Sequence, residues 1–180
     1  MTDNHIVIAK IQPTPLGMIW LGVTSNGLAS ISFFNTQSEF EDELTDHGYE
    51  QITTDNGYAQ KFVNQIQQYL HAERQQFDLP IDWRIMTPFQ QQVLQATQAI
   101  PYGETRSYAQ IAAQIGKPRA ARAVGRAQAT NPIPLVIPCH RVIGSDGKLH
   151  GYGGRGGIRT KAWLLALESG EKLPPPIPVN

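Results

Sequence analysis

The hydrophobic pattern of this chain changes from strand-like to helix-like along its length. In the first third, three segments are rich in β-branched and aromatic residues, at 6–11, 18–23 and 28–34. Asn26-Gly27 lies between the second and the third, and Asn-Gly between apolar runs favours a hairpin because both residues accept a positive φ. Apolar residues at helical spacing then indicate a short helix around Phe40 and Leu44 and a longer one over 62–70. The first half is therefore expected to form a small antiparallel sheet with helices packed on it.

Cap-forming residues mark the helices of the second half. Residues 72–86 are polar or irregular, and we interpret them as a link. Residues 87–90 read Thr-Pro-Phe-Gln, in which Thr can cap a helix, Pro suits the first helical position and Gln can complete a capping box. A last helix is expected over 158–168. The predicted organisation is α+β, with an N-terminal α/β domain at 1–85, a helical domain at 86–170 and an extended, proline-rich tail at 171–180.

Two short helices in the second domain match a helix-turn-helix. Residues 107–110 form a second capping box and start a helix that Gly116 ends, and the next helix is expected from about 119 to 127. This second helix is dense in alanine, and small side chains let a helix approach another surface closely. Two interpretations remain open from these residues: tight packing on a neighbouring helix, or a helix pressed into a DNA groove with Arg122 and Arg126 projecting.

Composition limits the compartment and the partners. The chain has 180 residues, 41% of them apolar. It has no signal-peptide pattern and no apolar run near the ~20 residues that span a bilayer, so a cytoplasmic location without membrane contact is expected by default. Its one cysteine cannot form an internal disulfide, and no His or Cys pair has zinc spacing. Net charge is zero, but residues 117–126 hold four bases and no acid, so any basic face is local.

Prolines bracket the single cysteine. Residues 131–139 read Asn-Pro-Ile-Pro-Leu-Val-Ile-Pro-Cys, so a short, stiff apolar strand is expected to end just before Cys139. His140 follows, and an adjacent histidine can lower the pKa of a thiol or take its proton. These residues alone leave a second interpretation open, in which a buried structural cysteine stands beside a surface histidine.

The motifs around Cys139 resemble those of one known family. Residues 138–142, Pro-Cys-His-Arg-Val, are similar to the active-site signature of the O6-alkylguanine-DNA alkyltransferases, the methylated-DNA–protein-cysteine methyltransferases. The resemblance spans roughly residues 86–170 in unbroken order and also includes an N-terminal Thr-Pro-Leu-Gly. Its further motifs are at 107–111, 119–125, 131–132, 151–154 and 161–168. It implies a ribonuclease H-like N-terminal domain and a winged-helix-like C-terminal domain.

The resemblance implies a role for each catalytic residue. Cys139 would be the nucleophile that accepts the alkyl group of O6-alkylguanine in DNA. His140 would take its proton through a bridging water, Glu168 would hold and polarise His140, and Asn131 would brace the turn around the cysteine. Alkyl-cysteine is a stable thioether, so each molecule is expected to react once, with no cofactor and no metal. Some relatives hold a structural zinc through N-terminal cysteines, which this chain lacks.

The resemblance also implies how the protein meets double-stranded DNA. The helix-turn-helix would enter the minor groove, and the base must be flipped out because a thiol cannot reach it in the stack. Arg122 would fill the gap left in the stack, and Tyr108 would crowd the target phosphate and contact the flipped base. The other residues expected at the groove are Ala121, Ala123 and Gly125, and those expected to line the guanine pocket are Val142, Tyr152 and Gly153. A monomer is expected, and a preference between O6-alkylguanine and O4-alkylthymine is left open.

One departure and three rival functions remain at this stage. The glycine-rich segment 151–158 is about two residues longer than the usual family loop, which leaves the width of the pocket open. A damage-binding alkyltransferase-like protein flips the base without chemistry, but it would carry Trp in place of Cys139. A helix-turn-helix transcription factor would prefer one DNA sequence, and a cysteine hydrolase would turn over an ester or amide.

Overall fold

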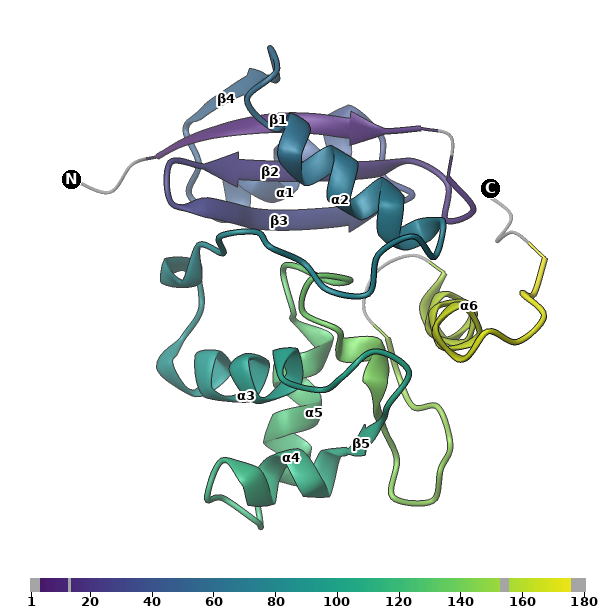
Figure 1. The fold of residues 1–180 in the computed structure, drawn as a ribbon. Helices are drawn as coiled ribbons and strands as arrows, with labels where there is room; N and C mark the ends of the chain where they lie inside the picture. Colours follow the sequence, from purple (N-terminus) through teal and green to yellow (C-terminus); the bar gives the residue numbers. More distant parts are fainter. Residues whose placement is uncertain (1–3, 13, 153–155, 176–180) are drawn as a thin grey trace. The chain divides into compact units, whose positions relative to one another are not determined.

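A computed structural model describes residues 4–12, 14–152 and 156–175 of the chain. The chain divides into two compact units, one that ends at Ile85 and one that comprises Met86–Pro175 (Figure 1). Each unit is described by itself. Within the described ranges, no helix is long and apolar enough to cross a bilayer.

A four-stranded sheet forms the centre of the first unit. β1 (His5–Ile11), β2 (Ile19–Thr24) and β3 (Gly27–Phe33) are antiparallel neighbours, and β4 (Gln51–Thr54) pairs parallel with β1, which gives the order β3-β2-β1-β4. The hairpin predicted at Asn26-Gly27 is confirmed, and Gly27 has a φ of 126°. β4 is polar and mostly exposed, so the sequence carried no apolar signal for it.

Helices cover both faces of this sheet. In Figure 1, α1 (Gln37–Asp46) lies behind the strands and α2 (Gln60–Leu70) lies in front of them. Phe40 and Leu44 of α1 pack in one buried cluster with residues of β1 and β2, as their spacing predicted. Every residue of β2 is buried, which is expected of a strand that is covered on both sides.

Three helices of the second unit surround one apolar cluster. α3 (Pro88–Gln98), α4 (Tyr108–Gln114) and α5 (Ala121–Ala129) contribute Val93, Ile111 and Val124, which are all buried. The two helices α4 and α5 form the predicted helix-turn-helix, with Gly116 at a φ of 73° between them. α5 begins two residues later than predicted, because Lys117–Ala120 form a turn that is closed by a hydrogen bond from the Ala120 amide to the Lys117 carbonyl (2.8 Å).

The two predicted capping boxes have different outcomes. At α4 both hydrogen bonds are present: the Ser107 hydroxyl accepts from the Gln110 amide, and the Gln110 side chain accepts from the Ser107 amide. At α3 the Thr87 hydroxyl caps the helix as predicted. The reciprocal bond predicted for Gln90 is wrong, because its side-chain amide instead donates to the carbonyl of Thr130 at the end of α5 (2.9 Å).

The apolar strand predicted just before Cys139 is also wrong. Residues 131–138 form successive turns, with Leu135 at a φ of 72° and the Ile137 amide bonded to the Ile133 carbonyl (2.9 Å). The three prolines of this segment lack the N–H groups that a sheet ladder requires. A 3-10 helix, η2 (Cys139–Arg141), follows directly, and β6 (Val142–Ile143) then pairs parallel with β5 (Arg106–Ser107).

The last helix, α6 (Gly157–Ser169), brings a further group of buried side chains to the second unit. Trp163 and Leu164 are buried as predicted, and Gly170, in the left-handed conformation, ends the helix. Another short 3-10 helix, η1 (Trp83–Ile85), ends the first unit. Residues 171–175 of the expected tail form neither helix nor strand, and residues 176–180 lie outside the described residues.

We expect Gly27→Ala to destabilise the first unit more than Gly57→Ala. Both glycines have a positive φ, 126° and 110°, so either substitution strains the backbone by about 1–3 kcal/mol. A methyl group at Gly27 would also collide with the carbonyl of Pro80, whereas nothing lies near the same position at Gly57. Urea denaturation followed by circular dichroism should show the larger loss for Gly27→Ala. Equal losses would contradict the close approach of Pro80 to the hairpin.

Candidate active site

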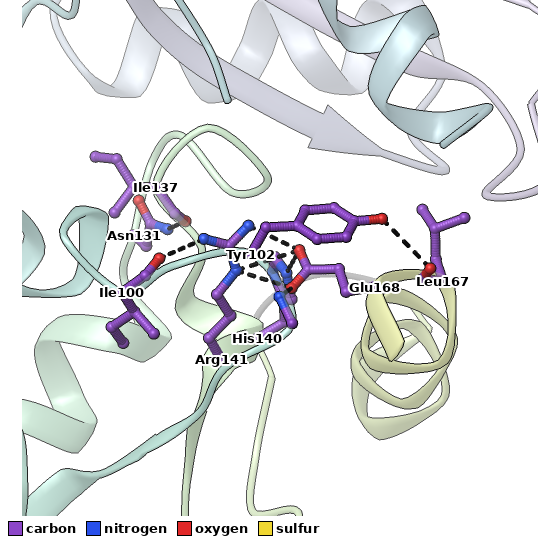
Figure 2. Close-up of polar contacts among 9 residues, drawn as sticks. Ile100, Tyr102, Asn131, Ile137, His140, Arg141, Leu167 and Glu168 are labelled. Carbon is purple, nitrogen blue, oxygen red and sulfur yellow. Dashed lines mark hydrogen bonds and ion pairs between the residues drawn. The ribbon is translucent and has the colours of Figure 1, made fainter. Parts of the chain in front are cut away.

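The turn that precedes η2 holds the sulfur of Cys139 in place. The side-chain amide of Asn131 donates to the carbonyl of Ile137 (2.9 Å) and to Sγ of Cys139 (3.1 Å), and its oxygen accepts from the amide of Ile133 (3.0 Å). The contact between Asn131 and Ile137 is drawn in Figure 2. Asn131 thus joins the two ends of the proline-rich turn and directs an N–H group at the sulfur.

The environment of Cys139 favours a thiol in the resting protein. The residue is buried, and burial raises the pKa of its thiol. The hydrogen bond from Asn131, the charge of Lys161 and a hydrogen bond with Tyr152 oppose this effect without reversing it. An adjacent histidine can lower the pKa of a thiol or take its proton. Because the pKa of Cys139 is raised, the thiol reacts only after a base has taken its proton.

His140 and Glu168 form a buried pair between η2 and α6. Nε2 of His140 lies 2.8 Å from Oε1 of Glu168, and the two side chains are 0% and 1% exposed (Figure 2). A carboxylate at Nε2 favours the tautomer that carries the hydrogen there and leaves the lone pair on Nδ1. Burial lowers the pKa of His140, which outweighs the opposing effect of Glu168. A neutral imidazole with its lone pair on Nδ1 is the form that can accept a proton there.

Arg141 binds the same carboxylate, a contact that the sequence analysis did not identify. Its Nε lies 2.9 Å from Oε2 of Glu168 and its Nη2 lies 2.9 Å from Oε1, while Nη1 donates to the carbonyl of Ile100. The amide of Gly103 also donates to Oε2 (3.1 Å), and the ring of Tyr102 lies 5.7 Å from the guanidinium carbon. Figure 2 shows His140 and Arg141 converging on the carboxylate of Glu168. The sequence feature that could have indicated this contact is the arginine within the motif at 138–142.

Lys161 is a second buried cation that the sequence analysis did not single out. It is 1% exposed, and its Nζ donates to the carbonyls of Val142 (2.6 Å) and His150 (3.2 Å). Nζ also lies 5.7 Å from the centre of the Tyr108 ring. Burial lowers the pKa of Lys161 to about 8, and the neighbouring Cys139 acts in the opposite direction. The one sequence feature that could have indicated the burial of Lys161 is its position in a helix whose other side chains were predicted to face inward.

A pocket of 810 Å³ opens beside the helix-turn-helix. Five of the residues predicted at the DNA groove or the base pocket line it: Tyr108, Ala121, Arg122, Gly125 and Tyr152. The remaining wall comes from Ala109, Ala129, Gly144, Ser145, His150 and Gly151. The walls therefore belong to α4, α5 and the segment 144–152.

Two predicted residues do not line the pocket, and a third cannot be compared with the structure. Val142 packs in the apolar cluster of the helices, so its side chain does not form the wall, although its carbonyl binds Lys161. Ala123 is exposed on α5. Gly153 lies outside the described residues. The part of the chain that is described contains no group of three or more His, Cys, Asp or Glu side chains that could hold a metal ion.

Tyr108 and Tyr152 connect the pocket with the sulfur. Both line the pocket. Tyr152 is among the groups that lower the pKa of Cys139, and Cys139 adds to the effect of burial in raising the pKa of the Tyr108 hydroxyl. The ring of Tyr108 also passes close to Gly125, where a Cβ would lie 3.8 Å from it. The sulfur therefore lies close enough to interact with two tyrosines of the pocket wall, which also includes the exposed Arg122.

Two family models match the chain, one for each unit. Residues 7–83 match the ribonuclease-like domain of 6-O-methylguanine DNA methyltransferase. Residues 88–170 match the DNA binding domain of the same protein. These matches confirm the expected α+β organisation, with a ribonuclease-like N-terminal domain and a helical C-terminal DNA binding domain.

Characterised relatives give the same result. The chain is 54% identical over 116 residues to the methylated-DNA–protein-cysteine methyltransferase of Mycobacterium tuberculosis, which covers 64% of this chain and 68% of the relative. It is 42% identical over 156 residues to the constitutive enzyme of that name from Bacillus subtilis, covering 86% and 91%. A crystal structure of Mycobacterium tuberculosis OGT in complex with DNA superposes with a TM-score of 0.78 at 42% identity, covering 91% of this chain and 93% of the other.

The buried lysine predicts a pH-dependent stability. Lys161 loses its proton near pH 8 in the folded protein and near its ordinary value of 10.5 when unfolded. Between these values the unfolded chain binds more protons, so raising the pH should stabilise the folded state, by at most about 1.4 kcal/mol per pH unit.

Lys161→Met supplies the comparison. Both proteins would carry Cys139→Ser, so that the thiol does not titrate. Urea denaturation at pH 7.5 and 9.5 should show the free energy of unfolding of the Lys161 protein rising relative to that of the Met variant. A difference that does not change with pH would contradict the lowered pKa of Lys161.

Proposed function

Because the chain belongs to the 6-O-methylguanine DNA methyltransferase family, we propose that it repairs DNA by moving the alkyl group of O6-alkylguanine onto Sγ of Cys139. The activity of this family is that of a methylated-DNA–protein-cysteine methyltransferase. The observation that carries the assignment to Cys139 is its sulfur, which accepts from Asn131 and interacts with two tyrosines of the pocket wall, next to a buried His140–Glu168 pair. It is also the one cysteine of the chain.

The transfer can be written with balanced atoms. His140 takes the thiol proton at Nδ1, by way of a water molecule in the mechanism that the family implies, and Glu168 stabilises the imidazolium through Nε2. The sulfur electron pair then forms a bond to the alkyl carbon, and the bond from that carbon to O6 breaks. The guanine keeps the electron pair and takes up one proton, which balances the proton lost by the thiol. The products are alkyl-cysteine and guanine.

The pocket supports a flipped base as the substrate. A base in a stacked duplex cannot reach a buried sulfur, whereas an extruded base can enter a pocket of this kind. DNA is the partner in the Mycobacterium tuberculosis complex, and here the exposed Arg122 on the pocket rim would occupy the space that the extruded base leaves. Small residues on the same face of α5 would let the helix approach the minor groove, as the sequence analysis expected.

The thioether product explains a single use of each molecule. The bond between carbon and sulfur in a thioether is stable to hydrolysis, so the transfer does not regenerate the thiol of Cys139. All the proposed catalytic side chains come from one chain, so a monomer suffices. The reaction consumes a reduced thiol, and a reducing compartment such as the cytoplasm suits it.

Incubation with a duplex that contains one O6-methylguanine tests the proposal. The intact protein should gain the mass of one methyl group in a 1:1 ratio, and peptide mapping should place the group on Cys139. Cys139→Ser should bind the duplex without gaining mass. Methyl transfer that persists in Cys139→Ser, or repair that continues beyond one equivalent, would overturn the proposal. DNA binding with no mass gain by the unsubstituted protein would favour a damage-binding or sequence-reading protein instead.

We expect Arg122→Ala to slow the reaction with duplex DNA, with Arg126→Ala as the matched control. Both arginines are exposed on α5, but only Arg122 lines the pocket. At saturating duplex, Arg122→Ala should reduce the single-turnover rate constant by about 10-fold or more, because the unstacking of a base costs a few kcal/mol. Reaction with free O6-benzylguanine should change little.

Arg126→Ala should instead raise the duplex concentration needed for half-saturation, with a nearly unchanged rate constant at saturation. This is the expected result for a side chain that contacts only phosphates. If Arg122→Ala slows the free base and the duplex equally, the arginine does not support base flipping.

A further inference from the structure

We propose that Arg141 is a positioning residue for the transfer: it holds the carboxylate of Glu168 and offsets its charge, so that His140 stays neutral until it receives the proton of Cys139. This inference rests on the proposed function, because it concerns the base of that reaction. It gives a role to a motif residue that the mechanism above does not use.

The geometry shows that His140 and Arg141 share one carboxylate. Oε1 of Glu168 accepts from Nε2 of His140 (2.8 Å) and from Nη2 of Arg141 (2.9 Å), and Oε2 accepts from Nε of Arg141 (2.9 Å). Arg141 therefore makes a two-point contact that occupies both oxygens, while the imidazole contacts Oε1 of the same carboxylate. In such a contact the planar guanidinium also fixes the rotation of the carboxylate.

The guanidinium itself is held on its other sides. Its remaining terminal nitrogen, Nη1, donates to the carbonyl of Ile100, and the ring of Tyr102 lies 5.7 Å from its central carbon. The hydroxyl of Tyr102 donates to the carbonyl of Leu167, next to Glu168 in α6 (3.3 Å). Arg141 is 5% exposed and an arginine does not lose its charge in proteins, so this positive charge is permanent and fixed.

The positive charge of Arg141 affects the protonation of His140, because both side chains are buried and the protein interior screens charges poorly. The groups that act on the imidazole are Glu168 and Lys161 from α6 and Arg141 from η2. A buried histidine that faced an unshared carboxylate would be favoured as imidazolium, which cannot accept a proton. The two cations counter the carboxylate and, together with burial, keep the pKa of His140 below its ordinary value.

A purely structural role for Arg141 makes a different prediction. In that case its side chain only fastens α6 to η2, and its loss would lower the amount of folded protein or the rate at every pH alike. If its charge sets the protonation of His140, its loss should move the pH at which activity disappears. The position of the acid limb on the pH axis is thus the readout that separates the two roles.

The test compares Arg141→Met and Arg141→Lys with the unsubstituted protein. Single-turnover methyl transfer from an O6-methylguanine duplex is measured from pH 5 to pH 9. Without the positive charge, the midpoint of the acid limb should move upward by about one pH unit, the size expected for removal of a neighbouring charge. Arg141→Lys keeps a charge near Glu168 and should return the midpoint to within half of that shift, even if its plateau rate is lower.

The outcomes are separable. A midpoint that stays in place in Arg141→Met, with methyl transfer still on Cys139, overturns the role of Arg141 and leaves the proposed function intact. Failure of the unsubstituted protein to take up methyl at all overturns the proposed function instead. An upward shift in Arg141→Met that Arg141→Lys reverses supports the inference.

A measurement on the unsubstituted protein covers the case in which Arg141→Met does not fold. The ring nitrogens of His140 can be followed by NMR as the pH is lowered. They should show a neutral imidazole with its hydrogen on Nε2 well below pH 6.5, the ordinary pKa of histidine. A His140 that titrates at or above that value overturns the inference without any variant.

Discussion

The carboxylate of Glu168 is the group on which the second unit and its site both depend. It joins α6 to η2 through His140 and Arg141, and it reaches the segment between α3 and α4 through the amide of Gly103. A buried carboxylate is tolerated only when its oxygens are occupied by strong donors, and removal of one partner of such a group costs about 3–5 kcal/mol. The carboxylate of Glu168 therefore holds η2 and α6 together and also orients His140, the proposed general base.

Burial favours the uncharged form of three titratable groups at and around the sulfur. It raises the pKa of Cys139 and lowers those of His140 and Lys161, and in each case it is the largest cause. All three shifts favour the uncharged form. The ion pair of Arg141 and Glu168 supplies the fixed charges of the site, and the reacting groups become charged only when the proton moves. Such an arrangement favours the unreactive thiol form of Cys139 until a base removes its proton.

Local signals in the sequence predicted much of the fold. Asn26-Gly27, the Ser107 capping box and Gly170 were read correctly, because each depends on a few neighbouring residues. The predictions failed where a distant partner decides the outcome. Gln90 turns to Thr130, forty positions away, and β4 forms although its residues are polar, because β1 offers a free edge. Pattern alone could not show these contacts.

The same division applies to the site. The motif identified Cys139 and its neighbour, but the burial of Arg141 and Lys161 could not be read from it, since both are usually surface residues. Both side chains can be buried because backbone carbonyls that are distant in the sequence accept their hydrogen bonds. Arg141 donates to the carbonyl of Ile100, and Lys161 donates to those of Val142 and His150.

The alanine-rich helix α5 confirms the packing that its small residues predicted, while its contact with a DNA groove stays a prediction. Val124 and Ala127 pack in the apolar cluster, and Gln128 is buried beside them. At the complementary helical spacing, Ala121, Gly125 and Ala129 line the pocket together with Arg122. Helix packing and an open, small-residue surface therefore occupy different faces of the same nine residues. Larger side chains on the pocket face would take up pocket space, and at Gly125 they would also meet the ring of Tyr108, so the small residues of that face keep the pocket open.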